Sequence, residues 1–217
     1  MKFCVVFDFD GVIIHSRDVQ QIAFYESYKM FRGDGNPPFE EFLSQSGNSI
    51  SAIFKKMNFP VEMIDIYKKI SQENLHHILI TPGIEKLLIK LKKNDIYCGL
   101  CTGKDRIRTI EILNYLNLYD YFDSIVCSDD VANPKPEAES LLKLLNELNI
   151  DNSNAVMVGD AMNDILCAHN ANVKSIAVSW GDCIDHNILK VNPHYLVKTV
   201  DELEKCIESL VFLKNPC

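Results

Sequence analysis

Short apolar runs recur along the chain, and most of them end at a polar residue or a glycine. Runs of this length bounded by turn residues are typical of buried strands. The segments between the runs carry apolar residues at helical spacing, as at Ile84, Leu87, Leu88 and Leu91. Strands that alternate with such helices predict parallel βαβ units. The pattern therefore predicts a doubly wound, Rossmann-like α/β core with strands at 3–7, 96–101, 125–127, 155–159, 175–178 and 195–197.

Residues 15–80 do not follow this alternation. An apolar stripe at helical spacing begins at Val19, and the Gly/Asn/Pro-rich stretch 33–38 breaks the chain. Further helical patterns cover 39–45, 50–57 and 61–77. We therefore expect an all-helical lobe, residues 15–80, inserted into a core formed by residues 1–14 and 81–217.

Composition narrows the class of protein. The 217 residues are enough for one sizeable core with a smaller inserted lobe. A formal charge of −8 argues against nucleic acid as a partner, because binding to a phosphate backbone needs a cationic face. No apolar run approaches the length that spans a bilayer, and the first residues lack the layout of a signal peptide. We expect a cytoplasmic protein with no membrane partner, as a monomer or homodimer.

Eight cysteines include a CxxC pair at Cys98 and Cys101. Such a pair can indicate a redox site or a zinc site. Reactive pairs usually open a helix, whereas these two lie inside a predicted strand, and no second CxxC or CxxH follows at zinc-ligand spacing. We therefore interpret them as small buried hydrophobic residues.

Two carboxylates follow the first strand. Asp8 and Asp10 are two residues apart, so they share a face at the carboxyl end of that strand, where open α/β sheets bind ligands. Asp8 is placed to act as a nucleophile, and Asp10 to protonate a departing oxygen and later activate water. The alternative is a strand-ending pair that caps the next segment.

Two further strand ends supply groups that suit a phosphate. Thr102 and Gly103 offer a hydroxyl and an open backbone N–H at the start of a helix, although Thr-Gly is also common in turns. Lys135 lies between two prolines, a rigid setting for a fixed positive charge. An isolated Pro-Lys-Pro would more often be a surface turn.

Asp160 and Asp164 follow the strand at 155–159 and are one helical turn apart. Mg²⁺ prefers hard oxygen ligands and keeps several waters, which suits Asp8, Asp160 and the backbone carbonyl of Asp10 as its protein ligands. The alternative for Asp160 is a helix N-cap.

In this order and spacing, the motifs resemble those of the haloacid dehalogenase superfamily, and within it the phosphoglycolate phosphatase and β-phosphoglucomutase-like enzymes with a helical cap after the first strand. The resemblance implies that Asp8 is a phospho-aspartate nucleophile and Asp10 the acid/base. It further implies that Thr102 and Lys135 hold the phosphate, that Asp160 binds Mg²⁺, and that Asp164 supports the metal from its outer shell. His15 departs from the family pattern, since many capped relatives have an aspartate there.

We therefore expect a magnesium-dependent phosphatase that hydrolyses a small phosphorylated metabolite. A sugar phosphomutase would use the same residues and return the phosphoryl group to the substrate. Dehalogenation and phosphonate cleavage fit less well because of Asp10, and the intact motif residues argue against a catalytically silent binding protein. The loop Ser46-Gly47-Asn48-Ser49 is a candidate specificity element or a helix-joining turn with Ser49 as N-cap.

Overall fold

Six parallel strands form the central sheet of the computed structural model, which describes residues 2–45, 47–181 and 188–214. The order across the sheet is β5-β4-β1-β6-β7-β8. This arrangement confirms the predicted doubly wound α/β core. The strands are β1 (Cys4–Phe7), β4 (Tyr97–Cys101), β5 (Ser124–Val126), β6 (Ala155–Gly159), β7 (Lys174–Val178) and β8 (Tyr195–Val197).

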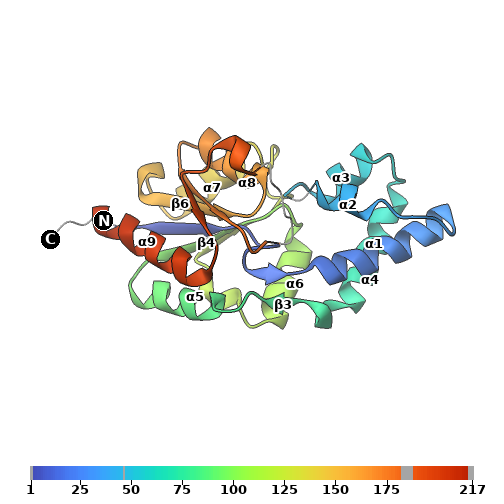
Figure 1. The fold of residues 1–217 in the computed structure, drawn as a ribbon, viewed down its shortest axis with the longest axis horizontal. Helices are drawn as coiled ribbons and strands as arrows, with labels where there is room; N and C mark the ends of the chain where they lie inside the picture. The colour runs from blue at the N-terminus through green and yellow to red at the C-terminus, as the bar shows by residue number, and fades with distance from the viewer. Residues whose placement is uncertain (1, 46, 182–187, 215–217) are drawn as a thin grey trace.

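Helices cover both faces of the sheet (Figure 1), so alternate residues of β1 pack into different layers. Val5 and Phe7 belong to the cluster that includes side chains of α5, α6 and α9, whereas Cys4 and Val6 belong to the cluster of α7 and α8. Burial of β1 on both sides explains why its sequence is a continuous apolar run. The helices of the core are α5 (Ile84–Lys93), α6 (Arg106–Tyr115), α7 (Glu139–Glu147), α8 (Met162–Asn170) and α9 (Val200–Lys214), with short 3₁₀ turns η2 (Tyr119–Tyr121), η3 (Asn152–Asn154) and η4 (Ile188–Val191).

A helical lobe lies beyond one end of the sheet, on the right in Figure 1. Its core is aromatic and separate from those of the sheet: Phe24 stacks on Phe42 with ring centroids 4.7 Å apart, and Phe54 packs edge-on against Phe24. The helices agree with the sequence patterns. They are α1 (Arg17–Arg32), α2 (Phe39–Leu43), α3 (Ile50–Lys56) and α4 (Glu62–Glu73), followed by the 3₁₀ turn η1 (Leu75–His77).

A two-stranded ribbon that the sequence did not predict joins this lobe to the core. β2 (Ile14–His15) pairs antiparallel with β3 (Leu79–Ile80), so that Ile14 faces Ile80 and His15 faces Leu79. Strands of two residues are too short to produce a period-2 pattern. The chain therefore enters and leaves the lobe through neighbouring, hydrogen-bonded segments.

The CxxC residues lie inside β4, as expected. Cys98 and Cys101 are both buried free thiols. Burial raises the pKa of Cys98 to about 12, which keeps its thiol protonated and unreactive. Their interpretation as buried hydrophobic residues is confirmed.

Among the described residues, none of the helices combines the length and the apolar character that a membrane crossing requires.

Candidate active site

The sheet topology brings the polar strand ends to one edge. β1 lies between β4 and β6. From β1 the chain runs outward through β4 and β5, and it then crosses back to β6, β7 and β8 on the other side of β1. Open α/β sheets form ligand sites where the strand order reverses in this way. The backbone N–H of Asp8 donates to the Val158 carbonyl at 2.9 Å, and that of Thr102 donates to Val126 at 3.0 Å. The hydrogen bonds of the sheet thus fix Asp8 and Thr102 directly at the ends of their strands.

Lys135 lies beside Asp8, although the two residues are far apart in sequence. Its Nζ is 2.7 Å from Asp8 Oδ1 and 2.6 Å from Asp164 Oδ1, and it also donates to the Cys101 carbonyl at 3.1 Å. Only 3% of Lys135 and 4% of Asp8 are exposed. The ammonium is therefore a fixed charge inside the site, and the alternative of a surface turn is wrong.

Three buried carboxylates meet next to this lysine. Ligand oxygens of Asp8, Asp160 and Asp164 lie within 4.8 Å of one another, a donor set of hard oxygens that fits a divalent cation such as Mg²⁺. Both oxygens of Asp164 already have partners, because Oδ1 accepts from Lys135 and Oδ2 accepts from the backbone N–H of Ala161 at 3.0 Å. This position fits Asp164 as a group that supports the metal site.

Asp160 is not a helix N-cap. The cap of α8 is Ala161, one residue later, and Asp164 accepts from its N–H in the first turn of the helix. A Cβ added at Gly181 would lie 2.2 Å from Asp160 Oδ2, so the segment after β7 packs directly against this carboxylate. The alternative function for Asp160 is therefore wrong, whereas its assignment as a metal ligand stays a prediction.

Burial and nearby carboxylates change the pKa of Asp8, the candidate nucleophile. Desolvation, together with the nearby carboxylate of Asp164, raises the pKa of Asp8 to about 7, although Lys135 acts in the opposite direction. The neighbouring carboxylates in turn hold the pKa of Lys135 well above its ordinary value, despite its burial. One lysine does not neutralise three carboxylates, and a divalent cation would supply the missing charge.

Asp10 has different surroundings from Asp8. Its side chain is 24% exposed, and its Oδ2 lies 3.2 Å from Lys104 Nζ. Ser16 donates a hydrogen bond to Oδ1, and Gln20 of α1 donates to Ser16 Oγ at 2.7 Å. The carboxylate is therefore held in place on the solvent side of the site, where a general acid would meet a leaving group. No pattern in the sequence indicated Gln20, because a glutamine on a helix is ordinary.

Thr102 and Gly103 lie next to a loop of the helical lobe. The Lys104 N–H donates to Thr102 Oγ1 at 3.1 Å, which leaves the hydroxyl hydrogen available as a donor. A Cβ at Gly103 would lie 2.5 Å from the carbonyl oxygen of Gly47, so the two loops are in contact. Ser49 is the N-cap of α3 and accepts from Ala52 N–H at 3.3 Å, as the alternative for this loop predicted. Ser46 lies outside the described residues.

A cavity of about 80 Å³ lies between the lobe and the core, with Asp8, Asp10 and Thr102 in its wall. The lobe contributes residues of α1, α2, α3 and α4, and the core contributes the segment 102–105 together with Arg108 of α6. Sequence analysis did not identify Arg108 or Lys68 as site residues, because single cations on helices are usually solvated.

Comparison with known proteins agrees with this geometry. The sequence profile of haloacid dehalogenase-like hydrolases matches residues 5–178. Pyrophosphatase PpaX of Bacillus pumilus is 30% identical over 203 residues, covering 92% of this chain and 93% of the relative. Pyrophosphatase PpaX of Bacillus cereus is 33% identical over 182 residues, covering 81% and 82%.

A solved structure described as a predicted phosphatase, from Clostridium acetobutylicum, superposes with a TM-score of 0.83 at 26% identity. The match covers 96% of this chain and all of the other. Profile, relatives and structure agree along most of the sequence. The chain belongs to the haloacid dehalogenase-like hydrolase family, and it is a phosphatase of that family.

Proposed function

We propose that this protein is a magnesium-dependent phosphatase that hydrolyses a small phosphorylated metabolite through a phospho-aspartate on Asp8. The observation that carries the proposal is the ion pair of Asp8 with Lys135, 2.7 Å long and buried at the carboxyl edge of the sheet. A buried carboxylate that is fixed by a lysine and close to two more carboxylates suits nucleophilic attack on a phosphate. We further propose that residues 15–80 are the cap domain, and 1–14 with 81–217 the catalytic core.

Each side chain would have a separate task. The Asp8 carboxylate attacks phosphorus while the bond to the leaving oxygen breaks, and Asp10 gives that oxygen a proton. In the second half, Asp10 takes a proton from water, the resulting hydroxide attacks phosphorus, and the Asp8–phosphorus bond breaks to restore the carboxylate and release phosphate. The Thr102 hydroxyl, the Gly103 N–H and Lys135 would hold the phosphate oxygens.

Asp8, Asp160 and the backbone carbonyl of Asp10 would hold Mg²⁺, with Asp164 in support. When bound, the ion neutralises negative charge on the carboxylates and on the phosphate oxygens. Lys135 meanwhile fixes the orientation of both Asp8 and Asp164 through its two short contacts. A cytoplasmic location is also proposed, since the described cysteines are free thiols, as a reducing compartment requires.

The test is release of phosphate from a panel of phosphate esters and pyrophosphate with Mg²⁺, with Asp8→Asn as the inactive variant. The PpaX relatives are named pyrophosphatases, so inorganic pyrophosphate belongs in this panel. Asp201→Asn, at an exposed position in the first turn of α9, is the matched control. Free phosphate as the product supports the proposal, whereas an isomeric sugar phosphate would establish the mutase alternative.

A further inference from the structure

Three cationic side chains line the active-site cavity. Lys68 comes from α4 of the lobe, Lys104 from the segment after β4, and Arg108 from α6 of the core. Three carboxylates line the same cavity, and two of them are paired with these cations: Lys104 with Asp10 and Lys68 with Asp105. The proposed catalysis at Asp8 gives no reason for Lys68 or Arg108, because Lys135 and Thr102 already serve the reacting phosphate.

Arg108 is the most firmly placed of the three. Its side chain is only 8% exposed, one end of the guanidinium donates to Ser71 Oγ of α4 at 2.7 Å, and the other pairs with Glu111. These two contacts account for two of the five N–H groups of a guanidinium. The remaining N–H groups suit a carboxylate or a phosphate, which guanidinium groups bind with paired hydrogen bonds.

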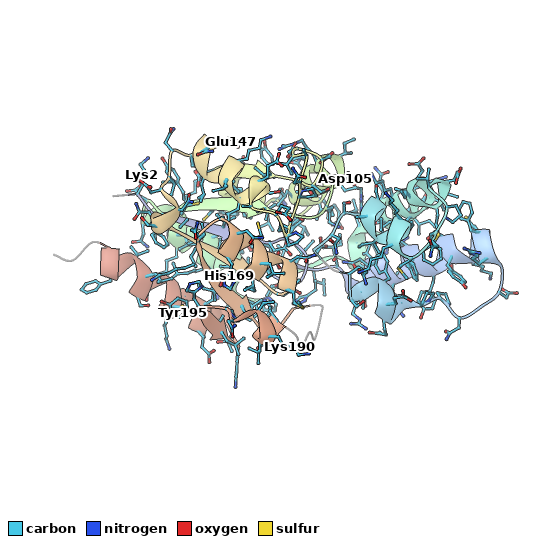
Figure 2. The ribbon with its side chains drawn as sticks, turned by 90° about the horizontal axis from the view of Figure 1, so that it is seen from above. Lys2, Asp105, Glu147, His169, Lys190 and Tyr195 are labelled. Carbon is cyan, nitrogen blue, oxygen red and sulfur yellow. The ribbon has the colours of Figure 1, made fainter. Side chains whose placement is uncertain are left out.

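Asp105 brings Lys68 next to Arg108. Lys68 Nζ lies 3.0 Å from Asp105 Oδ2, and Asp105 also caps α6 by accepting from the Arg108 N–H at 3.2 Å. Figure 2 shows Asp105 on the side of the core that faces the helical lobe. The lysine side chain is 35% exposed, so this ion pair is partly solvated and open to exchange with an anionic ligand.

The lining of the cavity combines two sets of groups. Asp8 and Thr102 belong to the proposed reaction, and Lys68 and Arg108 have no part in it. Lys135 pairs with Asp8, and Lys104 pairs with Asp10. A cavity of about 80 Å³ leaves room for only a compact leaving group. An anion beside Lys68 and Arg108 would gain charge-assisted hydrogen bonds, and a neutral group would gain none.

We infer that the substrate is a compact molecule with two separate anionic groups a few bonds apart, whose second group binds Lys68 and Arg108 while the first, a phosphate, reacts at Asp8. This inference rests on the proposed phosphatase function and narrows its substrate class. Inorganic pyrophosphate and the phosphate esters of short hydroxy acids share this chemistry. Phosphorylated sugars with uncharged leaving groups do not.

The first test compares kcat/KM for pyrophosphate, 2-phosphoglycolate, glucose 6-phosphate and p-nitrophenyl phosphate. The wild type should prefer either pyrophosphate or 2-phosphoglycolate. The preferred substrate shows whether the second anionic group is a phosphate or a carboxylate. Lys68→Met and Arg108→Met should each lower kcat/KM for pyrophosphate and 2-phosphoglycolate, which have a second anionic group, about 10- to 100-fold, the range for one hydrogen bond to a charged group. Turnover of p-nitrophenyl phosphate should change less than about threefold.

Two controls separate anion binding from support of the lobe. Lys69→Met removes the next lysine of α4, which is 75% exposed and lies 4.0 Å from Glu73. Gln72→Ala removes a different contact between the lobe and the core, the 2.5 Å hydrogen bond to Glu111. Both controls should keep the wild-type order of substrates. Equal losses on all four substrates in Arg108→Met and Gln72→Ala would show that Arg108 only supports the lobe, and would overturn the inference.

A binding measurement distinguishes failure of the inference from failure of the proposed function. Methylenediphosphonate resists hydrolysis, so its affinity for the Asp8→Asn protein can be measured by calorimetry without turnover. If Arg108→Met in that background weakens binding about tenfold or more, the subsite stands even if no ester is hydrolysed. Unchanged affinity, or a wild-type preference for glucose 6-phosphate, would overturn it.

Discussion

Lys135 Nζ lies 2.7 Å from Asp8 Oδ1, and both residues are almost completely buried. The contact joins the first strand of the chain to a loop more than a hundred residues later. It determines the position and the charge of the carboxylate on which the proposed chemistry depends.

Lys135→Met should destabilise the protein as well as inactivate it. The substitution leaves Asp8 and Asp164 buried without their ammonium, and breaking a buried ion pair costs about 3–5 kcal/mol. Denaturant unfolding measures this loss, and saturating Mg²⁺ should recover part of it. A variant as stable as the wild type in the absence of metal would contradict the burial of charge described here.

Asp8→Asn and Asp10→Asn should reduce turnover for different reasons and to different extents. The first removes the nucleophile and should abolish turnover. The second should lower kcat about 10²-fold or more, the usual contribution of general acid–base catalysis, while the metal affinity is retained. Metal affinity by calorimetry and phosphate release by a colorimetric assay check the two effects. An Asp10→Asn enzyme with an unchanged rate on an ester with a poor leaving group would exclude its acid function.

Stability without metal should fall as the pH rises from about 4 to about 7. The pKa of Asp8 is raised from 3.8 to about 7, so in this range the folded protein holds a proton that the unfolded chain has released. The contribution of Asp8 is complete below its ordinary pKa and is lost as the pH passes its folded pKa. Thermal unfolding in the presence of chelator, compared with Asp8→Asn, measures the effect.

The affinity for magnesium should have the opposite dependence on pH from the stability of the metal-free protein. Binding requires the ionised carboxylate, so the affinity should rise with pH up to about 7 and proton release should accompany binding below that pH. Calorimetry in buffers of different ionisation enthalpy counts the protons released. Binding at pH 6 without proton release would show that Asp8 is already ionised in the metal-free protein.

Gly103→Ala should impair catalysis by keeping the lobe away from the core. The added Cβ would lie 2.5 Å from the Gly47 carbonyl oxygen, closer than any tolerable contact, and backbone atoms cannot yield as a flexible side chain would. We expect kcat/KM to fall while thermal stability changes little. Gly35→Ala is the matched control, since its Cβ would meet only the ring of Tyr28, at 3.3 Å. Equal activity of both variants would mean that contact between the two loops is not needed for turnover.

Local patterns were sufficient to predict the core of this fold. β1 and β6 are buried on both faces, so each appears in the sequence as a continuous apolar run. The buried face of α5 appears as apolar residues at helical spacing, namely Ile84, Leu87 and Leu88. The pattern did not predict β2 and β3, because a pair of two-residue strands depends on contacts between residues far apart in sequence.

The candidate site was predictable where a residue follows a strand directly. Asp8, Thr102 and Asp160 are placed by their strands, so their convergence follows from the parallel sheet. Lys68 and Arg108 come from two helices, one in the lobe and one in the core, and only the packing of the lobe on the core brings them into one cavity. Sequence spacing contains no information about that packing, and therefore these two residues were not predicted.

The ribbon of β2 and β3 has a consequence for how this architecture can change. Because Ile14 and Ile80 are direct partners, the two ends of the insertion lie side by side, as the two ends of a hairpin loop do. The insertion is therefore attached to the core in the same way as a hairpin loop of any length. The entropy of closing that loop grows only slowly with the number of residues inside it. A shorter, longer or unrelated lobe could therefore replace this one without altering the register of any strand in the main sheet, so the lobe can change while the sheet stays constant.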